Sequence, residues 1–145
     1  MILLTGASGQ VGWEVVQRAK VLGMPVHATT RQELDITDAG AVARAMAEVE
    51  PSVVVNAAAY TAVDRAEDEP GAAFAVNRDG AEHLAAGALR AGVPLIHLST
   101  DYVFDGSSSV PYKPSDPASP TGVYGRSKWE GEAAVRRRPS RHLIV

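Results

Sequence analysis

Tyr124 and Lys128 are the two residues whose types and spacing best suit proton transfer. They stand four positions apart in "TGVYGRSKWEGE", where a helix is expected to begin, and residues so spaced share one face of a helix. Tyrosine normally has a pKa of about 10, and a nearby ammonium group favours the phenolate. The pair therefore predicts a tyrosine that exchanges a proton near neutral pH, although by itself the spacing fits a solvated helix surface better.

Three glycines in "TGASGQVG" predict a turn that binds a pyrophosphate. Gly6, Gly9 and Gly12 follow the apolar run 1–5, which is expected to be a buried strand, and they open a helix. Glycine lets a phosphate approach the backbone, and the first turn of a helix offers free N–H groups and a partial positive charge. The alternative is a tight turn that only packs the helix closely on the sheet.

The string "TTRQELD", at the end of the second expected strand, bears on the choice of nicotinamide cofactor. A chain that binds NAD often has an acidic residue here, but this chain has Thr30 and Arg31, and Glu33 comes later. Because arginine binds phosphate through paired hydrogen bonds, the sequence favours NADPH and leaves NADH open. Asp35 and Ile36 are candidates for the adenine edge. A solvated loop arginine is the plainer interpretation.

The ends of the third and fourth expected strands carry small and hydroxyl residues. The string "NAAAY" (56–60) lets a cofactor lie close to the backbone, or packs tightly between sheet and helix. Ser99, Thr100 and Asp101 end the fourth strand, where a hydroxyl can bind a substrate carbonyl or cap the next turn. Asn77 lies in an alanine-rich helix, where its amide either bonds backbone near the site or faces solvent.

Composition excludes several classes of protein. The 145 residues fit one domain, the net charge of −3 gives no reason to expect nucleic acid or an anionic membrane, and the lack of cysteine excludes thiolate metal sites. The four histidines show no metal spacing, so no metal is expected. The arginines at 136–138 are interpreted as a solvated helix end. The apolar start is too short for a signal peptide or a membrane span, so a soluble cytoplasmic protein is the default.

Strands and helices alternate along the chain, which predicts a parallel sheet built from right-handed βαβ units. The expected strands are residues 1–5, 25–30, 52–59, 94–100 and 141–145, and the expected helices are residues 9–23, 38–50, 71–92 and 123–136. The fold class is therefore a Rossmann-like, doubly wound parallel sheet, with ligands at the carboxyl ends of its strands. We expect one NAD(P)-binding domain over residues 1–145, which ends inside an expected strand.

Taken together, these strings resemble the extended short-chain dehydrogenase/reductase family. The resemblance covers essentially the whole chain and is carried by "TGASGQVGWE", "PSVVVNAAAYTAVDRAEDEP", "VNRDG", "IHLSTDYVFDG" and "VYGRSKWEGE". It implies a hydride transfer from NADPH or NADH to the 4-keto carbon of a dTDP-linked 4-keto deoxysugar. The implied substrate is dTDP-4-dehydro-6-deoxy-L-mannose and the product is dTDP-L-rhamnose, a precursor of cell-wall polysaccharide.

The resemblance also implies roles for individual residues. Tyr124 would protonate the developing alkoxide, Lys128 would hold the nicotinamide ribose and lower the pKa of Tyr124, and Thr100 would bind the carbonyl oxygen. The other residues implied to bind the cofactor are Gly6, Gly9, Gln10, Val11, Gly12, Thr30, Arg31, Asp35, Ile36, Ala57, Ala58 and Ala59. The other residues implied to lie near the sugar are Tyr60, Thr61, Asp101 and Tyr102.

Two alternatives stay open beside the reductase. Nucleotide-sugar dehydratases and epimerases resemble this chain, but the dehydratases usually carry an Asp-Glu pair after the threonine, whereas Thr100 is followed by Asp101 and Tyr102. A non-catalytic relative, the regulatory subunit of methionine adenosyltransferase, shares the "STDYVF" type of string. Family members are about twice as long, so the chain is expected to be truncated before the substrate domain. A homodimer is compatible with the resemblance.

Overall fold

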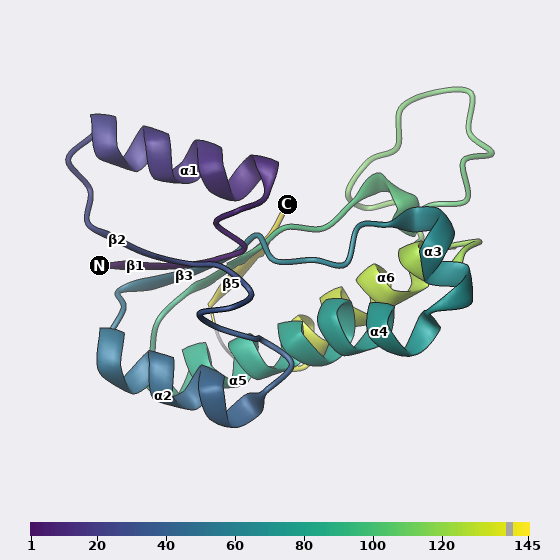
Figure 1. Cartoon of the computed structure of the whole chain (residues 1–145). Coiled ribbons are helices and arrows are strands. Elements are labelled where there is room, and N and C mark those ends of the chain that lie inside the picture. Colours follow the sequence, from purple (N-terminus) through teal and green to yellow (C-terminus); the bar gives the residue numbers. More distant parts are fainter. Residues whose placement is uncertain (139–140) are drawn as a thin grey trace.

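The computed structural model describes residues 1–138 and 141–145 and contains one five-stranded sheet. The strands are β1 (Ile2–Thr5), β2 (Val26–Thr29), β3 (Val53–Asn56), β4 (Leu95–His97) and β5 (His142–Ile144). All neighbouring pairs are parallel, in the order β2-β1-β3-β4-β5 (Figure 1). The order reverses between β1 and β3, which is where doubly wound sheets bind ligands.

Helices cover both faces of the sheet, so the predicted doubly wound architecture is confirmed. The helices are α1 (Gln10–Val21), α2 (Ala39–Val49), α3 (Val63–Asp68), α4 (Pro70–Phe74), α5 (Ala81–Ala91) and α6 (Val123–Arg136). Helix α1 lies on one face, whereas α2, α5 and α6 lie on the other (Figure 1). A short 3₁₀ helix, η2 (Asp101–Val103), follows β4.

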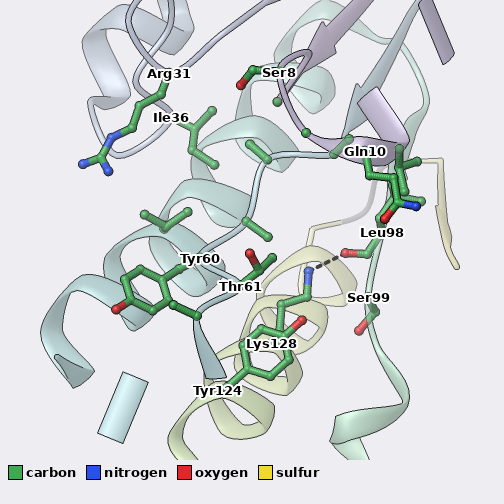
Figure 2. Close-up of a pocket in the computed structure, with 18 of the residues that line it drawn as sticks. Ser8, Gln10, Arg31, Ile36, Tyr60, Thr61, Leu98, Ser99, Tyr124 and Lys128 are labelled. Carbon is green, nitrogen blue, oxygen red and sulfur yellow. Dashed lines mark hydrogen bonds between the residues drawn. The ribbon is translucent and has the colours of Figure 1, made fainter. Parts of the chain in front are cut away.

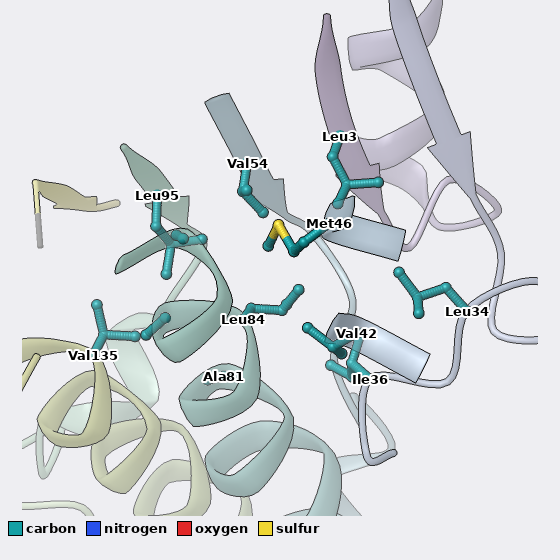
Figure 3. Close-up of a cluster of buried hydrophobic side chains, with 12 residues drawn as sticks. Leu3, Leu34, Ile36, Val42, Met46, Val54, Ala81, Leu84, Leu95 and Val135 are labelled. Carbon is teal, nitrogen blue, oxygen red and sulfur yellow. The ribbon is translucent and has the colours of Figure 1, made fainter. Parts of the chain in front are cut away.

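The larger hydrophobic core lies between the sheet and the helices α2, α5 and α6. Leu3, Val54 and Leu95 alternate with opposite-facing residues in their strands and belong to one buried cluster with Leu84 and Val135 from the helices (Figure 3). A smaller cluster joins α3, α4 and α6 through Ala66, Ala73, Val123 and Tyr124. The second cluster packs the helix that carries the predicted proton donor against its neighbours.

The structure differs from the sequence prediction at three places. The expected helix 71–92 is interrupted by the π-helical segment η1 (Ala75–Gly80), because an alanine-rich sequence gives no signal that separates π from α geometry. The strands β3 and β4 are shorter than predicted. The arginines Arg136 and Arg138 are not simply solvated, since each pairs with a glutamate.

No helix within residues 1–138 and 141–145 combines the length and the hydropathy that crossing a bilayer requires. Over the same residues, histidines and carboxylates form no group of three or more that could hold a metal ion.

Candidate active site

A cavity of about 640 Å³ opens at the carboxyl ends of β1, β3 and β4 (Figure 2). Of the predicted site residues, those that line it are Gly6, Gly9, Gln10, Val11, Arg31, Asp35, Ile36, Ala57, Ala58, Ala59, Tyr60, Thr61, Tyr124 and Lys128. The predicted residues outside its lining are Gly12, Thr30, Thr100, Asp101 and Tyr102. Segments that are far apart in the sequence thus line one cavity.

The three glycines of the first turn have different structural roles. Gly6 has a φ of +77°, and a Cβ there would lie 2.5 Å from Ala58 N. A Cβ on Gly12 would lie 2.1 Å from Gly6 O, so Gly12 packs α1 against the turn. A Cβ on Gly9 would meet only Gly6 O at 3.4 Å, which is ordinary contact. The fold therefore requires Gly6 and Gly12, whereas Gly9 leaves open space on the cavity side.

The N-terminus of α1 fits an anionic cofactor. Gly9 is its N-cap residue, no side chain of the described chain caps it, and its first turn holds no acidic residue. Gln10 and Val11, the next two residues, line the cavity. A dinucleotide pyrophosphate would meet free N–H groups and the positive end of the helix dipole here, without an obstructing Cβ at Gly9.

The segment after β2 forms the far wall of the cavity. Arg31 is exposed and lies at the edge of the cavity (Figure 2). The carboxylate of Glu33 accepts hydrogen bonds from the N–H of Thr30 at 2.7 Å and from its hydroxyl at 2.8 Å, which lowers the pKa of Glu33. Asp35 accepts from Thr37 in the same way. Arg31 is therefore the cation of this segment that reaches the cavity.

A row of hydrogen-bonded polar residues crosses the sheet beneath the cavity. Thr5 donates to Asn56 Oδ1 at 2.8 Å, and Asn56 Nδ2 donates to His97 Nδ1 at 3.0 Å. His97 is buried, which lowers its pKa to about 3, so the ring is neutral with its proton on Nε2. Asn56 Oδ1 also accepts from Ala58 N–H at 3.1 Å. This contact turns the chain out of β3 and brings the small residues after Asn56 to the cavity.

Asn77 fixes the next stretch of the lining from below. Its Oδ1 accepts from the N–H of Tyr60 at 2.8 Å, and its Nδ2 donates to Tyr60 O at 3.0 Å and to Ser127 Oγ at 2.9 Å. Of the two roles considered for Asn77, the structure shows the bond to backbone near the site. Because Ser127 is on α6, Asn77 also joins the loop after β3 to the helix of Tyr124.

Tyr124 and Lys128 project side by side from α6 into the cavity (Figure 2). Lys128 is only 2% exposed, and its Nζ donates to Leu98 O at 2.5 Å. Burial lowers the pKa of Lys128 from 10.5 to about 8, and the negative charge of Glu132 opposes that change. Tyr124 is 9% exposed and meets the ring of Tyr102 edge to face at 5.4 Å. An ammonium group thus sits beside a phenol in a largely dry site.

Thr100 lies one residue beyond the lining, at the start of η2. Its hydroxyl oxygen accepts from the N–H of Tyr102 at 3.2 Å, and its O–H donates to Asp101 at 3.4 Å. The capping role considered for this residue is therefore present. Asp101 and Tyr102 are exposed beside the cavity rather than part of its wall.

Sequence reasoning did not assign several cavity residues to the site. These are Ser8, Leu34, Ala62, Arg65, Val76 and Leu98. Ser8 stands between two predicted glycines, so counting every residue of that turn would have found it. Ser99, which the sequence placed with Thr100 and Asp101 at the end of the fourth strand, also lines the cavity. Arg65 and Val76 lie in strings that carry the family resemblance, but those strings gave neither residue a role in the site, and only the folded chain brings them to the cavity.

A sequence model of the family described as RmlD substrate binding domain matches residues 1–145. The chain belongs to the RmlD substrate-binding domain family. It is 45% identical over 144 residues to the dTDP-4-dehydrorhamnose reductase of Sinorhizobium fredii, a match that covers 99% of this chain and 48% of that protein. The chain spans about half the length of the curated relatives that it matches.

Solved structures with the same fold include two members named as reductases. The dTDP-4-dehydrorhamnose reductase of Clostridium acetobutylicum superposes with a TM-score of 0.96 at 40% identity, covering 99% of this chain and 51% of that one. The Bacillus anthracis reductase, solved in complex with NADP, gives a TM-score of 0.95 at 32% identity with the same coverage. The resemblance to reductases of this family is therefore confirmed.

Proposed function

We propose that the chain is the cofactor-binding part of an NAD(P)H-dependent dTDP-4-dehydrorhamnose reductase. The reaction is reduction of the 4-keto group of dTDP-4-dehydro-6-deoxy-L-mannose to dTDP-L-rhamnose. The observation that carries the proposal is the meeting of the Gly6–Gly9 turn with Tyr124 and Lys128 in one cavity. Arg31 and the NADP complex of the Bacillus anthracis relative favour NADPH, with NADH as the second cofactor. The proposal keeps the cytoplasmic location expected from the sequence.

The residues of the chain divide the chemistry among them. When bound, the reduced nicotinamide supplies a hydride to the carbonyl carbon of the sugar. Tyr124 donates its phenolic proton to the carbonyl oxygen as negative charge develops there. Lys128, held by Leu98 O, stabilises the resulting phenolate and would donate to the ribose of a bound nicotinamide cofactor. Thr100 donates a second hydrogen bond to the carbonyl oxygen once its O–H turns away from Asp101, while its oxygen goes on accepting from Tyr102 N–H.

The test separates cofactor binding from turnover. Binding of NADPH to the 145-residue chain is measured by the change in nicotinamide fluorescence. Oxidation of NADPH with the dTDP-4-keto sugar is measured in the protein expressed from its complete native gene. Replacing the proton donor in Tyr124→Phe should lower kcat by about 10²–10⁴ and leave the Kd for NADPH within about twofold. Turnover that survives in Tyr124→Phe would remove this tyrosine from the mechanism.

The same assays distinguish the alternatives. A regulatory protein binds the dinucleotide without oxidising it in the presence of the sugar. A dehydratase or an epimerase converts its sugar without net consumption of NADPH, and Asp101–Tyr102 lacks the acid pair that dehydratases usually carry. Net NADPH oxidation that depends on the dTDP-4-keto sugar is expected of the reductase alone among these three.

A further inference from the structure

Glu132 lies one turn beyond Lys128 on α6 and is only 7% exposed. A carboxylate with so little contact with water is costly unless it is hydrogen-bonded and paired. Both oxygens have partners: Oε1 accepts from Ser99 Oγ at 2.5 Å, and Oε2 lies 2.8 Å from the guanidinium of Arg136. The carboxylate therefore lies between the wall of the cavity and an arginine at the protein surface.

The bond to Ser99 reaches the chain immediately before Thr100. Ser99 and Leu98 both line the cavity, and Leu98 O accepts from Lys128 Nζ. Two consecutive residues are thus bonded to α6 by side chains that stand four positions apart on that helix. Glu132 and Lys128 together hold the end of the β4 segment against α6, and Thr100 is the next residue.

We propose that Glu132 is a positioning residue of this site. Its carboxylate holds Ser99, and hence Thr100, against α6, and its negative charge favours the protonated form of Lys128. The inference rests on the proposed function for its catalytic consequence, but its structural part does not. Because the carboxylate contacts Ser99 and Arg136 rather than the cavity itself, it acts through Thr100 and Lys128 and not on the substrate.

The charges around Lys128 give the sign of the electrostatic effect. Glu132 is the group whose charge raises the pKa of Lys128 against the effect of burial. Tyr124 is the other titratable residue of α6 beside it, and His97 on β4 is neutral because its pKa is about 3. The backbone N–H of Ser99 donates to the backbone oxygen of Val145, so this contact adds no charge to the surroundings of Lys128. Removing the charge of Glu132 should therefore make Lys128 lose its proton at lower pH.

The first experiment reads the proton on Lys128 directly and needs no turnover. The sequence contains three lysines, so a lysine-labelled chain gives few ¹³Cε signals in an NMR spectrum. The signal that disappears in Lys128→Arg is the signal of Lys128. In Glu132→Gln, which keeps the shape of the side chain, the Lys128 midpoint should fall by about one pH unit. In Glu132→Asp, which keeps the charge, it should stay near the wild-type value.

Glu130→Gln is the matched control, because it removes a half-exposed carboxylate of the same helix that pairs with Arg78 outside the cavity. It should leave the Lys128 midpoint in place. An unchanged midpoint in Glu132→Gln, or an equal shift in Glu130→Gln, would overturn the electrostatic half of the inference.

A second variant tests the positioning half and covers the case in which Glu132→Gln fails to fold. Ser99→Ala removes the hydrogen bond and keeps the charge, so kcat should fall about tenfold while the Lys128 midpoint stays unchanged. Full kcat in Ser99→Ala would overturn the positioning role. A wild-type protein without reductase turnover would refute the proposed function, whereas the midpoint shift in Glu132→Gln would still support the coupling of Glu132 to Lys128.

Discussion

The glycine turn and the α6 wall face each other across the cavity and are built in opposite ways. The turn consists of backbone, because Gly6, Gly9 and Gly12 have no Cβ atoms. The α6 wall is made of the buried side chains Tyr124 and Lys128, and Lys128 and the neighbouring Glu132 each bond to the chain just after β4. The turn is fixed by backbone conformation and by the close approach of the Ala58 backbone to Gly6, whereas the α6 wall depends on hydrogen bonds between side chains and residues that are distant in the sequence.

The largest expected effect comes from adding one methyl group to the turn. In Gly6→Ala the new Cβ would lie 2.5 Å from Ala58 N in a left-handed conformation, so the free energy of unfolding should fall by about 3–5 kcal/mol. Urea denaturation followed by circular dichroism measures it. Gly23 is the matched control, since its φ is +65° with no atom within 4 Å, and Gly23→Ala should cost only about 1 kcal/mol. Equal costs would show that the close approach in the turn is not rigid.

The stability of the folded chain should depend on pH through Lys128 of the α6 wall. The pKa of Lys128 is lowered from 10.5 to about 8 by burial, so above pH 8 the folded chain releases this proton before the unfolded chain does. The unfolded state then binds more protons, and stability rises with pH, by about 3 kcal/mol in total between pH 8 and 10.5. Below pH 8 the protonation of Lys128 adds no pH dependence to the stability, because the folded and the unfolded states both carry the proton.

Urea denaturation at several pH values in this window measures the rise, and Lys128→Met should remove it. Lys20 is exposed, so Lys20→Met serves as the control and should leave the slope as in the wild type. A slope that is the same in all three proteins would mean that Lys128 titrates normally in the folded chain.

The smallest expected effect is on the cofactor alone. Gly9 has a φ of −79°, and a Cβ there would make only one ordinary contact with the chain. Gly9→Ala should therefore keep the melting temperature within about 1 °C and weaken NADPH binding about tenfold, since the methyl group would face the cofactor. Thermal unfolding and fluorescence titration measure the two quantities. Unchanged NADPH affinity would remove the pyrophosphate from the neighbourhood of Gly9.

The same contrast explains what could be predicted from the sequence. The turn, the order of strands and helices and the start of α6 follow from local signals, namely glycine spacing and apolar periodicity. The bond of Ser99 to Glu132 joins residues 33 positions apart and depends on how α6 packs beside β4. The end of β3 at Asn56 depends on a side-chain contact with Ala58, which a run of small residues does not indicate.

The π-helical segment η1 joins α4 and α5 into one continuous helix whose two halves pack in different hydrophobic clusters. A π segment is equivalent to one residue inserted in an α-helix, and an insertion turns everything after it by about 100° around the axis. Ala73, before η1, packs in the small cluster with Tyr124, whereas Leu84, after it, packs under the sheet. Deleting one residue from η1 would bring the two halves back into a single helical phase. One of the two clusters would then lose its apolar face, even though no core residue had been replaced.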